Sequence, residues 1–329
     1  MKVLITGGAG YIGSTVASAC EDAGHDVVIL DDFSTGRREF VGKRPLYEGD
    51  IADDSLLDRL FEEQQIDAVV HCAAKIIVPE SVSEPLAYYK NNVAKTVTLL
   101  AALQRNGVER FLFSSSASIY APDENFVVTE DSPLQPGSPY ARTKFMVELI
   151  LEDFTRASDV RVASLRYFNP IGTDPKLRSG QQLEKPSHVL AKLLEAWVNK
   201  ETFTVTGVDW PTRDGSGIRD FIHVWDLARA HVAALEHFDE ATATDPYQVF
   251  NIGTGNGVTV KELAASFEKI TGDPLKVRFG DPRPGDVAGV YTVSTKAKDV
   301  LGWEAELTET DAVRDAIAWL PVRKEKLGY

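Results

Sequence analysis

Near its start the chain reads Lys2-Val-Leu-Ile-Thr6 and then, without a break, Gly7-Gly-Ala-Gly-Tyr-Ile-Gly13. The first run is apolar without alternation, which is typical of a parallel strand covered on both faces. The second fits Gly-x-Gly-x-x-Gly from Gly8 and equally Gly-x-x-Gly-x-x-Gly from Gly7. Residues without side chains let the backbone approach a pyrophosphate at the positive end of a helix. We therefore expect a strand, a phosphate-binding turn and a helix to about Ala23.

An acidic pair follows the next predicted strand. This strand, Asp26 to Leu30, ends in Asp31-Asp32, and Asp31 comes 18 residues after Gly13. Dinucleotide-binding folds place a carboxylate on the adenosine ribose at about this spacing, so the pattern predicts a dinucleotide site. Asp31 should repel a 2′-phosphate, which favours NAD over NADP. Arg37 and Arg38 could hold such a phosphate, but we favour their interpretation as solvated loop charges.

The alternation of strands and helices continues along the chain and predicts a doubly wound, parallel α/β sheet of the Rossmann type with a second, smaller α/β lobe. The NAD-binding domain is expected at residues 1–168 plus about 219–253, because 249–252 fits a further strand of the main sheet. The lobe that binds the substrate takes about 169–218 plus 254–329. Asp50 could accept a hydrogen bond from adenine or be a simple turn residue. His71 is expected to be a satisfied core histidine.

Composition narrows the possible partners and compartment. The formal net charge is −14, and such an excess of acid disfavours nucleic acid and anionic membranes, whose phosphates it repels. Cys20 and Cys72 are the only cysteines and have no spacing suited to zinc, so we expect no metal and no disulfide. No apolar run is long enough to span a bilayer, and the first strand leaves no room for a signal peptide. We expect a cytoplasmic protein.

A second motif, Tyr140-Ala-Arg-Thr-Lys144, follows the serine run Ser114-Ser115-Ser116. Residues four apart share one face of a helix, so the Lys144 ammonium can lie beside the Tyr140 phenol. A nearby cation lowers the pKa of an acid, and Tyr140 would then exchange protons near neutral pH. Tyr-x-x-x-Lys also occurs on ordinary amphipathic helices as an interfacial tyrosine with a solvated lysine. The spacing alone leaves both interpretations open.

The motifs together resemble a known family. The glycine turn, Ser114-Ser-Ser-Ala-Ser-Ile-Tyr120 and Tyr140–Lys144 are similar to the extended short-chain dehydrogenase/reductase superfamily. Arg166-Tyr-Phe-Asn-Pro170 and Arg219-Asp-Phe-Ile-His-Val-Trp-Asp226 narrow the resemblance to the UDP-glucose (UDP-galactose) 4-epimerase family, over essentially the whole chain. Related 4,6-dehydratases have an acidic pair after the catalytic serine or threonine. Here Ala117-Ser118-Ile119 follows Ser116, so dehydration is not expected.

The resemblance implies a reversible epimerisation at C4 of a UDP-hexose. Tyr140, ionised beside Lys144 and the nicotinamide cation, removes the proton of the 4-hydroxyl while the C4 hydrogen leaves as hydride to NAD. Ser116 hydrogen-bonds the same oxygen. The 4-keto sugar turns over and receives the hydride on its other face. Because a tightly gripped hexose could not turn, affinity must come from the non-reacting UDP.

The resemblance also implies two sets of binding residues. Positions that match cofactor contacts are Gly7, Gly10, Tyr11, Ile12, Gly13, Asp31, Asp32, Phe33, Ser34, Thr35, Gly36, Asp50, Ile51, Ala73, Ala74, Lys75, Asn91, Tyr140, Lys144 and Phe168. Positions that match substrate contacts are Ser116, Tyr140, Asn169, His188, Val189, Arg219, Arg283, Asp286 and Val290.

Three positions depart from the family pattern. The family's lysine near the cofactor commonly falls one residue after Lys75, and His188-Val189 stands where an Asn-Leu pair often contacts the substrate. Val290 stands where members restricted to unmodified sugars have a bulky tyrosine. A smaller side chain leaves room for an N-acetyl group, so we expect some activity on UDP-N-acetylglucosamine and UDP-N-acetylgalactosamine.

Other functions remain open from the sequence. One is a 4-epimerase of another nucleotide sugar such as UDP-glucuronate, and another is a non-catalytic dinucleotide sensor, which has no need for Ser116, Tyr140 and Lys144 together. The predicted helices 85–106 and 139–155 also look apolar over more than one face, which predicts a homodimer built on a four-helix interface. The residues expected in that interface are Val93, Val97, Leu100, Phe145, Leu149 and Ile150.

Overall fold

The computed structural model describes residues 1–329 except 122, 185, 187, 283–286 and 294. Its main strands are β1 (Lys2–Thr6), β2 (Asp26–Asp31), β3 (Leu46–Glu48), β4 (Ala68–His71), β5 (Arg110–Ser114), β7 (Arg161–Tyr167) and β11 (Tyr247–Ile252). Within the described residues they form one parallel sheet in the order β11-β7-β5-β4-β1-β2-β3. The predicted parallel sheet and the return of the chain at 249–252 are confirmed.

Helices cover both faces of this sheet. α1 (Tyr11–Asp22) and α8 (Val224–Glu236) pack on one face, and α2 (Asp54–Gln64), α5 (Lys95–Arg105) and α6 (Pro139–Ala157) pack on the other. Val3 and Ile5 of β1 contribute to the first core and Leu4 between them to the second. Since successive side chains of a strand point to opposite faces, a strand between two helical layers must be apolar throughout.

The predicted single helix 85–106 is interrupted. The structure has α3 (Val78–Ser83), α4 (Pro85–Tyr88), a π-helical turn over Tyr89–Ala94, and then α5. Asn92 in that turn is buried, and its amide accepts from the Lys75 N–H at 2.8 Å and donates to the Lys75 carbonyl at 2.9 Å and the Thr143 hydroxyl at 3.1 Å. Asn92 therefore ties the π-helical turn to the backbone of Lys75 and to α6.

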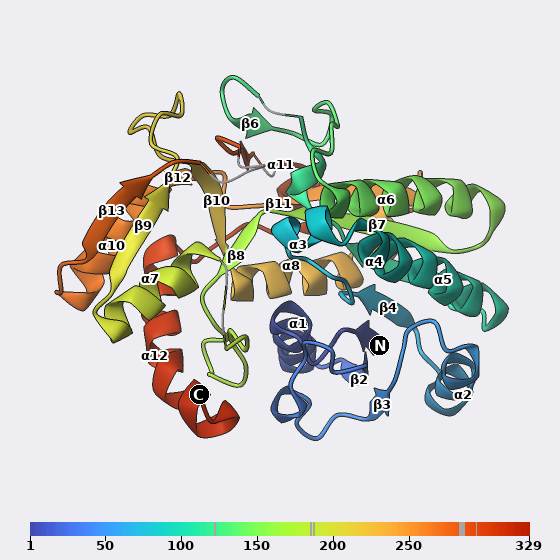
Figure 1. The fold of residues 1–329 in the computed structure, drawn as a ribbon. Helices are drawn as coiled ribbons and strands as arrows, with labels where there is room; N and C mark the ends of the chain where they lie inside the picture. The colour runs from blue at the N-terminus through green and yellow to red at the C-terminus, as the bar shows by residue number, and fades with distance from the viewer. Residues whose placement is uncertain (122, 185, 187, 283–286, 294) are drawn as a thin grey trace.

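A smaller α/β region lies beside the main sheet, on the left of Figure 1. β8 (Asn169–Ile171), β10 (Ile218–His223) and β12 (Gly257–Thr259) form one sheet there, and β9 (Thr202–Thr206) pairs with β13 (Lys276–Gly280). Its helices are α7 (Val189–Asn199), α10 (Val260–Thr271) and α12 (Glu309–Leu327). Leu193, Phe203, Phe267 and Val313 lie in its buried core. The remaining elements are β6 (Val127–Val128), paired with β14 (Tyr291–Thr292), α9 (Phe238–Ala241) and α11 (Thr295–Leu301).

Elements such as β10, α11 and the paired β6 and β14 cross the division into domains that the sequence predicts. α11 was expected in the smaller lobe, yet Ala297, Leu301 and Trp303 join the core that α1 and α8 form on the main sheet. β10 was expected in the NAD-binding domain, yet it pairs with β8 and β12 in the smaller sheet. The division itself stays a prediction.

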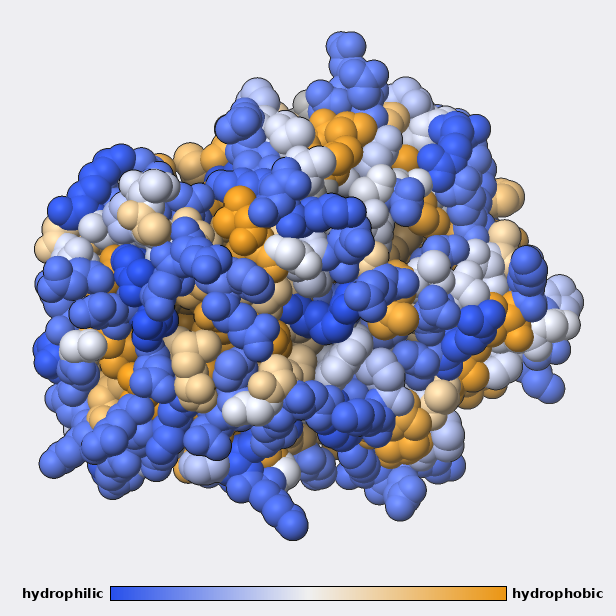
Figure 2. Space-filling view, turned by 180° about the vertical axis from the view of Figure 1, so that it is seen from behind, coloured by the Kyte–Doolittle hydropathy of each residue, from blue (hydrophilic) through white to orange (hydrophobic). Residues whose placement is uncertain are grey.

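The surface agrees with the charged composition. The face in Figure 2 is mostly hydrophilic, and its hydrophobic residues form small separate patches. Among the described residues, no helix combines the length and apolar character needed to cross a bilayer.

Candidate active site

The glycine turn joins β1 to the N-terminus of α1 and has no room for side chains at key positions. A Cβ on Gly7, whose φ is +70°, would lie 2.8 Å from backbone atoms of Ala73, and one on Gly13 would lie 2.2 Å from the Gly7 carbonyl oxygen. Gly10 is the N-cap of α1 and offers no capping side chain. The first N–H groups of α1 therefore have no capping side chain and form the positive end of the helix. This end fits the diphosphate of NAD.

Asp31 stands at the end of β2, beside this turn. Its carboxylate accepts hydrogen bonds from the N–H groups of Ala9 at 2.9 Å and Phe33 at 2.8 Å. The chain then folds back over the glycine turn, where the Arg37 N–H donates to the Ala9 carbonyl at 2.8 Å. Burial raises the pKa of Asp31. Each carboxylate oxygen can accept a second hydrogen bond, so the group fits the predicted ribose contact.

The other predicted cofactor residues are engaged to different degrees. Ala73 lies against Gly7 and so borders the glycine turn. Asp50 accepts from the Ala52 N–H, as a turn aspartate does, and also forms an ion pair of 2.5 Å with Lys95. Lys75 is exposed and forms an ion pair with Glu80 at 3.0 Å, so its ammonium is already neutralised. The contacts of these residues with a cofactor stay predictions.

Arg38 is an exposed loop charge as expected, whereas Arg37 is half-buried. The Arg37 Nε donates to the Tyr329 hydroxyl at 2.9 Å, and Arg38 forms an ion pair with Glu48 and lies over the Phe33 ring. These contacts occupy both guanidinium groups, which agrees with a preference for NAD over a cofactor with a 2′-phosphate.

Helix α6 carries the predicted catalytic pair into the protein interior. Ser138 caps the helix by accepting a hydrogen bond from the Ala141 N–H at 3.1 Å, and Pro139 occupies its first turn. Tyr140 is 8% exposed and Lys144 3%. The Lys144 ammonium donates to the Ser114 carbonyl at 2.7 Å and lies 4.8 Å from the centre of the Phe113 ring.

The predicted effect of Lys144 on Tyr140 is wrong for the polypeptide by itself. Burial raises the pKa of the Tyr140 phenol, and a hydrogen bond with Ser116 opposes the rise only in part. Burial also lowers the pKa of Lys144 to about 8. The physical reason is desolvation, which disfavours the charged forms of both groups, while the ammonium is directed at the Ser114 carbonyl.

Ser116 lies where the resemblance requires it. It lies two residues after the end of β5 and caps a short 3-10 turn by accepting from the Ser118 N–H at 3.2 Å, and its hydroxyl donates to the Ser118 hydroxyl at 2.9 Å. Ser116 also lowers the pKa of the Tyr140 phenol, so the two predicted catalytic hydroxyls lie near each other. The structure thus brings Ser116, Tyr140 and Lys144 together at the carboxyl end of the sheet.

His71 is buried in the core, and Cys72, between His71 and Ala73, is partly buried against that core. His71 contacts the hydroxyls of Thr6 at 2.7 Å and Thr96 at 3.0 Å, and burial lowers its pKa to about 3. Cys72 is a free thiol in contact with the Ser114 hydroxyl at 3.3 Å. The prediction of a satisfied core histidine is confirmed.

The predicted substrate residues begin on the smaller sheet. Asn169 is exposed at the start of β8, directly after the buried Phe168. Val290 packs against the cluster that contains Phe168 and Tyr120. Arg219 donates to the carbonyls of Ile218, Ala288 and Val287. Arg283 and Asp286 lie outside the described residues.

His188 and Val189 mark the start of α7. The His188 ring lies parallel to that of Tyr11, with centroids 6.4 Å apart, and contacts the Gln181 amide. The Tyr11 hydroxyl in turn donates to the Gly172 carbonyl at 2.7 Å. The start of α7 is therefore tied to the first turn of α1, next to the predicted cofactor site.

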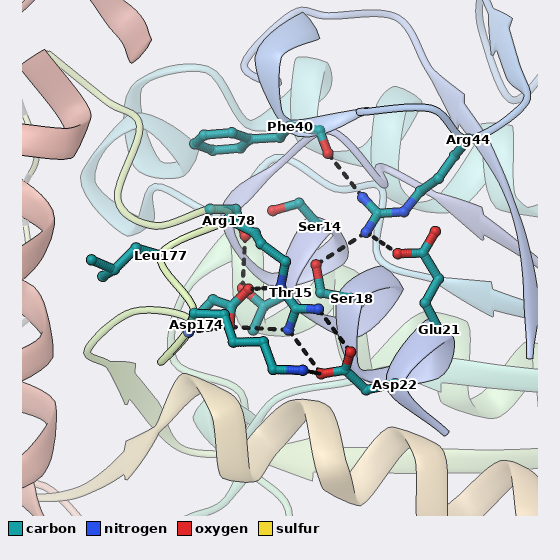
Figure 3. A network of polar contacts seen from close by, with 12 residues as sticks. Ser14, Thr15, Ser18, Glu21, Asp22, Phe40, Arg44, Asp174, Leu177 and Arg178 are labelled. Atoms are coloured by element: carbon teal, nitrogen blue, oxygen red, sulfur yellow. Dashed lines mark hydrogen bonds and ion pairs between the residues drawn. The ribbon is translucent and has the colours of Figure 1, made fainter. Parts of the chain in front are cut away.

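The sequence did not predict two polar networks. In one, Arg178 of the segment after β8 pairs with Asp22 of α1 and with Asp174 of its own segment, as Figure 3 shows. In the other, Glu148 of α6 forms a buried ion pair of 2.6 Å with Arg166. Glu148 follows Lys144 by one further helical turn, a spacing that could have signalled the same buried face. Its partner on β7 has no signal in the local sequence.

Comparisons with known proteins agree with this geometry. Residues 3–253 match the model of the NAD dependent epimerase/dehydratase family. A UDP-glucose 4-epimerase of Bacillus subtilis is 42% identical over 97% of this chain and 96% of the relative. The structure of a Bifidobacterium longum UDP-glucose 4-epimerase in complex with NAD+ and UDP has a TM-score of 0.92 at 34% identity and covers 100% of both chains.

A third similar protein is named for two sugars, glucose and N-acetylglucosamine. The UDP-Glc/GlcNAc 4-epimerase of Campylobacter jejuni has a TM-score of 0.83 at 35% identity over 98% of this chain and 99% of that one. These matches span the glycine turn, the catalytic helix and the smaller lobe alike. The chain therefore belongs to the NAD-dependent epimerase/dehydratase family, within its UDP-glucose 4-epimerase group.

Proposed function

We propose that this protein interconverts UDP-glucose and UDP-galactose by NAD-dependent epimerisation at C4. One observation carries the proposal, the burial of Ser116, Tyr140 and Lys144 beside a glycine turn that fits a diphosphate. A dinucleotide sensor needs the turn but not the buried triad. The relatives named UDP-glucose 4-epimerase support the same activity.

The residues of this chain supply the proton transfers. When bound, NAD supplies a hydride acceptor and a positively charged nicotinamide ring. Tyr140 takes the proton of the sugar 4-hydroxyl as the C4 hydrogen leaves, and it returns the proton when hydrogen is replaced on the other face. Ser116, which lies near Tyr140 and lowers its pKa, orients the same sugar oxygen. Because burial raises the pKa of Tyr140, the phenolate requires both neighbouring cations, Lys144 and the nicotinamide.

Substrate affinity comes from the half of the molecule that does not react. Asn169 and Arg219 lie on adjacent strands of the smaller sheet, β8 and β10, and we expect them to hold UDP together with Arg283 and Asp286. Arginine suits a diphosphate because its planar donors bind oxyanions in pairs. The hexose is then left free to turn between the two hydride transfers.

Two measurements test the activity. The purified protein, without added cofactor, should convert UDP-galactose to UDP-glucose, because the hydride is returned in each cycle and no NAD is consumed. Deuterium placed at C4 of UDP-galactose should stay at C4 of the product. A C4 hydrogen taken from solvent would contradict the mechanism, and turnover of UDP-glucuronate alone would favour the alternative substrate.

We further propose activity on the N-acetylated UDP-hexoses. Val290 packs against the cluster that contains Phe168 and Tyr120. Its side chain is smaller than the tyrosine of sugar-restricted members, so we expect it to leave room for the N-acetyl group of the sugar. The similarity to the Campylobacter jejuni UDP-Glc/GlcNAc 4-epimerase supports this range. A protein that turns over UDP-galactose but not UDP-N-acetylgalactosamine would contradict it.

We infer a homodimer that forms through α5 and α6. Figure 1 shows α4, α5 and α6 side by side at one edge of the protein. Val97 is 45% exposed, Met146 41% and Leu149 46%, so apolar side chains of both helices reach the surface. Leu100, expected in the interface, is buried in the monomer core instead, and Val93 and Ile150 pack against that core. Light scattering should give twice the chain mass, and a monomer would contradict the inference.

We also propose a cytoplasmic location and the two-part division predicted above. The free thiols Cys20 and Cys72 suit a reducing compartment, in which disulfides are rare. Fractionation of cells that produce the protein would test the location. Mapping amide hydrogen exchange with NAD and with UDP in turn would test whether each ligand protects its predicted part.

A further inference from the structure

Helix α6 carries a third residue on its buried catalytic face. Tyr140, Lys144 and Glu148 are spaced four apart, which places them one above another on one side of the helix. Glu148 is 3% exposed. A buried carboxylate is costly unless it is paired and hydrogen-bonded, so its partners show what it holds in place.

Glu148 has two partners, and both are buried. The Oε1 atom accepts two hydrogen bonds, one from the Ser115 hydroxyl and one from the Arg166 Nε at 3.0 Å. The second oxygen accepts from the Arg166 Nη2 at 2.6 Å. Such a paired contact with a planar guanidinium fixes the carboxylate in position. Arg166 is itself held on its other side by the Tyr120 hydroxyl at 3.0 Å.

Ser115 stands between two residues of the active site. Ser114 before it receives the Lys144 ammonium on its carbonyl, and the hydroxyl of Ser116 after it acts on the Tyr140 phenol by lowering its pKa. Helix α6 therefore holds the serine run at two consecutive residues, through Lys144 at Ser114 and through Glu148 at Ser115. The Ser116 hydroxyl follows directly and is positioned by both contacts.

Several titratable groups share this part of the interior with Lys144 and Glu148. Burial holds the pKa of His71 at about 3, that of His231 at about 4 and that of Cys72 at about 11, so these groups are neutral near pH 7. Burial raises the pKa of the Tyr140 and Tyr167 phenols, which are then neutral as well. Burial lowers the pKa of Lys144, and Cys72 first and then Glu148 raise it in part.

We propose that Glu148 is a positioning residue for the epimerisation: it holds the serine run against α6 through Ser115 and keeps a negative charge beside Lys144. This proposal rests on the proposed function, in which Ser116 and Tyr140 handle the sugar hydroxyl and Lys144 acts as a cation. Arg166 makes the arrangement possible, because its guanidinium compensates the charge of the buried carboxylate.

Two variants separate the two roles, with a matched control on the same helix. Glu148→Gln removes the charge but keeps a group that can contact Ser115. Ser115→Ala removes the hydrogen bond but keeps the charge. Glu152→Gln makes the same chemical change one turn further on, where the carboxylate pairs with Arg156 at the surface. The measurements are kcat, KM, the pH profile of kcat, the urea unfolding midpoint, and the titration of Lys144.

The Lys144 titration needs no catalysis. Carbon-13 NMR of the lysine Cε signals follows it directly, with the Lys144 signal assigned by its absence in Lys144→Met. In Glu148→Gln this signal should titrate at lower pH than in the wild type, and in Ser115→Ala and Glu152→Gln it should not move.

The kinetic outcomes follow from the same geometry. In Glu148→Gln, kcat should fall about 10- to 100-fold with little change in KM, and the alkaline limb of its pH profile should move to lower pH. Ser115→Ala should lower kcat without moving that limb, and Glu152→Gln should change neither. A residue that served stability alone would change the unfolding midpoint but leave the pH profile of the folded fraction in place.

Each contrary result would overturn a different part of the proposal. An unchanged Lys144 titration in Glu148→Gln overturns the electrostatic role, and wild-type kcat in Ser115→Ala overturns the positioning role. Should Glu148→Gln not fold, Glu148→Asp keeps the charge with a shorter reach and must retain the Lys144 titration while losing kcat. A wild-type protein without epimerase activity refutes the proposed function, whereas the NMR titration still decides whether Glu148 governs the charge of Lys144.

Discussion

The guanidinium of Arg178 donates two hydrogen bonds to the carboxylate of Asp22, at 2.9 and 3.0 Å, and so ties the segment after β8 to helix α1. The same guanidinium pairs with Asp174 at 2.5 Å, whose side chain is fully buried. Figure 3 shows Arg178 between the two carboxylates. Further along this segment, the Gln182 amide donates to the Thr35 carbonyl at 3.3 Å, within the loop expected to bind NAD.

Replacing Arg178 should therefore destabilise the protein. Arg178→Met leaves the buried Asp174 without its cation, and we expect the free energy of unfolding to fall by about 3 kcal/mol, the usual scale for breaking a buried pair. Lys176→Met is the control, because its ammonium pairs with Asp22 at an exposed position, where loss costs about 0.5 kcal/mol. Urea unfolding of the three proteins measures both changes. Equal midpoints for the two variants would contradict the assignment.

Replacing Tyr140 should separate catalysis from cofactor binding. Tyr140→Phe keeps the ring in its buried site but removes the hydroxyl proposed to accept the sugar proton, so turnover should fall about 100- to 10,000-fold. The glycine turn is untouched, and the amount of NAD that copurifies with the protein should not change. Absorbance of the cofactor released by denaturation measures this content. Substantial turnover in the variant would show that another group is the base.

The pH dependence of Lys144 gives a third prediction. Burial lowers its pKa from 10.5 to about 8, so the ammonium is lost as the pH rises through about 8. Turnover should decline on this alkaline side. Between pH 8 and 10.5 the unfolded state holds this proton more firmly than the folded state, so the contribution of Lys144 to stability increases with pH. The free energy of unfolding of the wild type, measured relative to that of Lys144→Met, should accordingly increase as the pH rises over this range.

Replacing Val290 tests the sugar range. Val290→Tyr places a larger side chain beside the cluster that contains Phe168 and Tyr120. We expect turnover of UDP-N-acetylgalactosamine to fall at least about 100-fold, with UDP-galactose turnover reduced less than about fivefold, because only the acetamido group needs the space. The ratio of the two kcat/KM values measures the change. An unchanged ratio would place the N-acetyl group elsewhere.

Much of the fold follows from local sequence. Lys2–Thr6 is a strand with the predicted bounds, and the strand predicted at Asp26–Leu30 extends by one residue to Asp31. These strands carry their signal in a few adjacent residues, since a buried parallel strand must be apolar on both sides. The departures arise where distant contacts override local preference. The π-helical turn at Tyr89–Ala94 coincides with Asn92, whose side chain binds the backbone of Lys75.

The sequence by itself determined which residues can perform the chemistry. The glycine turn, the serine run and the Tyr140–Lys144 spacing need only chain order and helix geometry, and the structure brings these residues together. Only the tertiary structure decided their electrostatic state, because pKa values depend on desolvation and on charges from remote segments. For this reason the pKa of Tyr140 is raised, whereas the sequence predicted that it is lowered. For the same reason the ion pair between Glu148 of α6 and Arg166 of β7 could not be predicted from either segment alone.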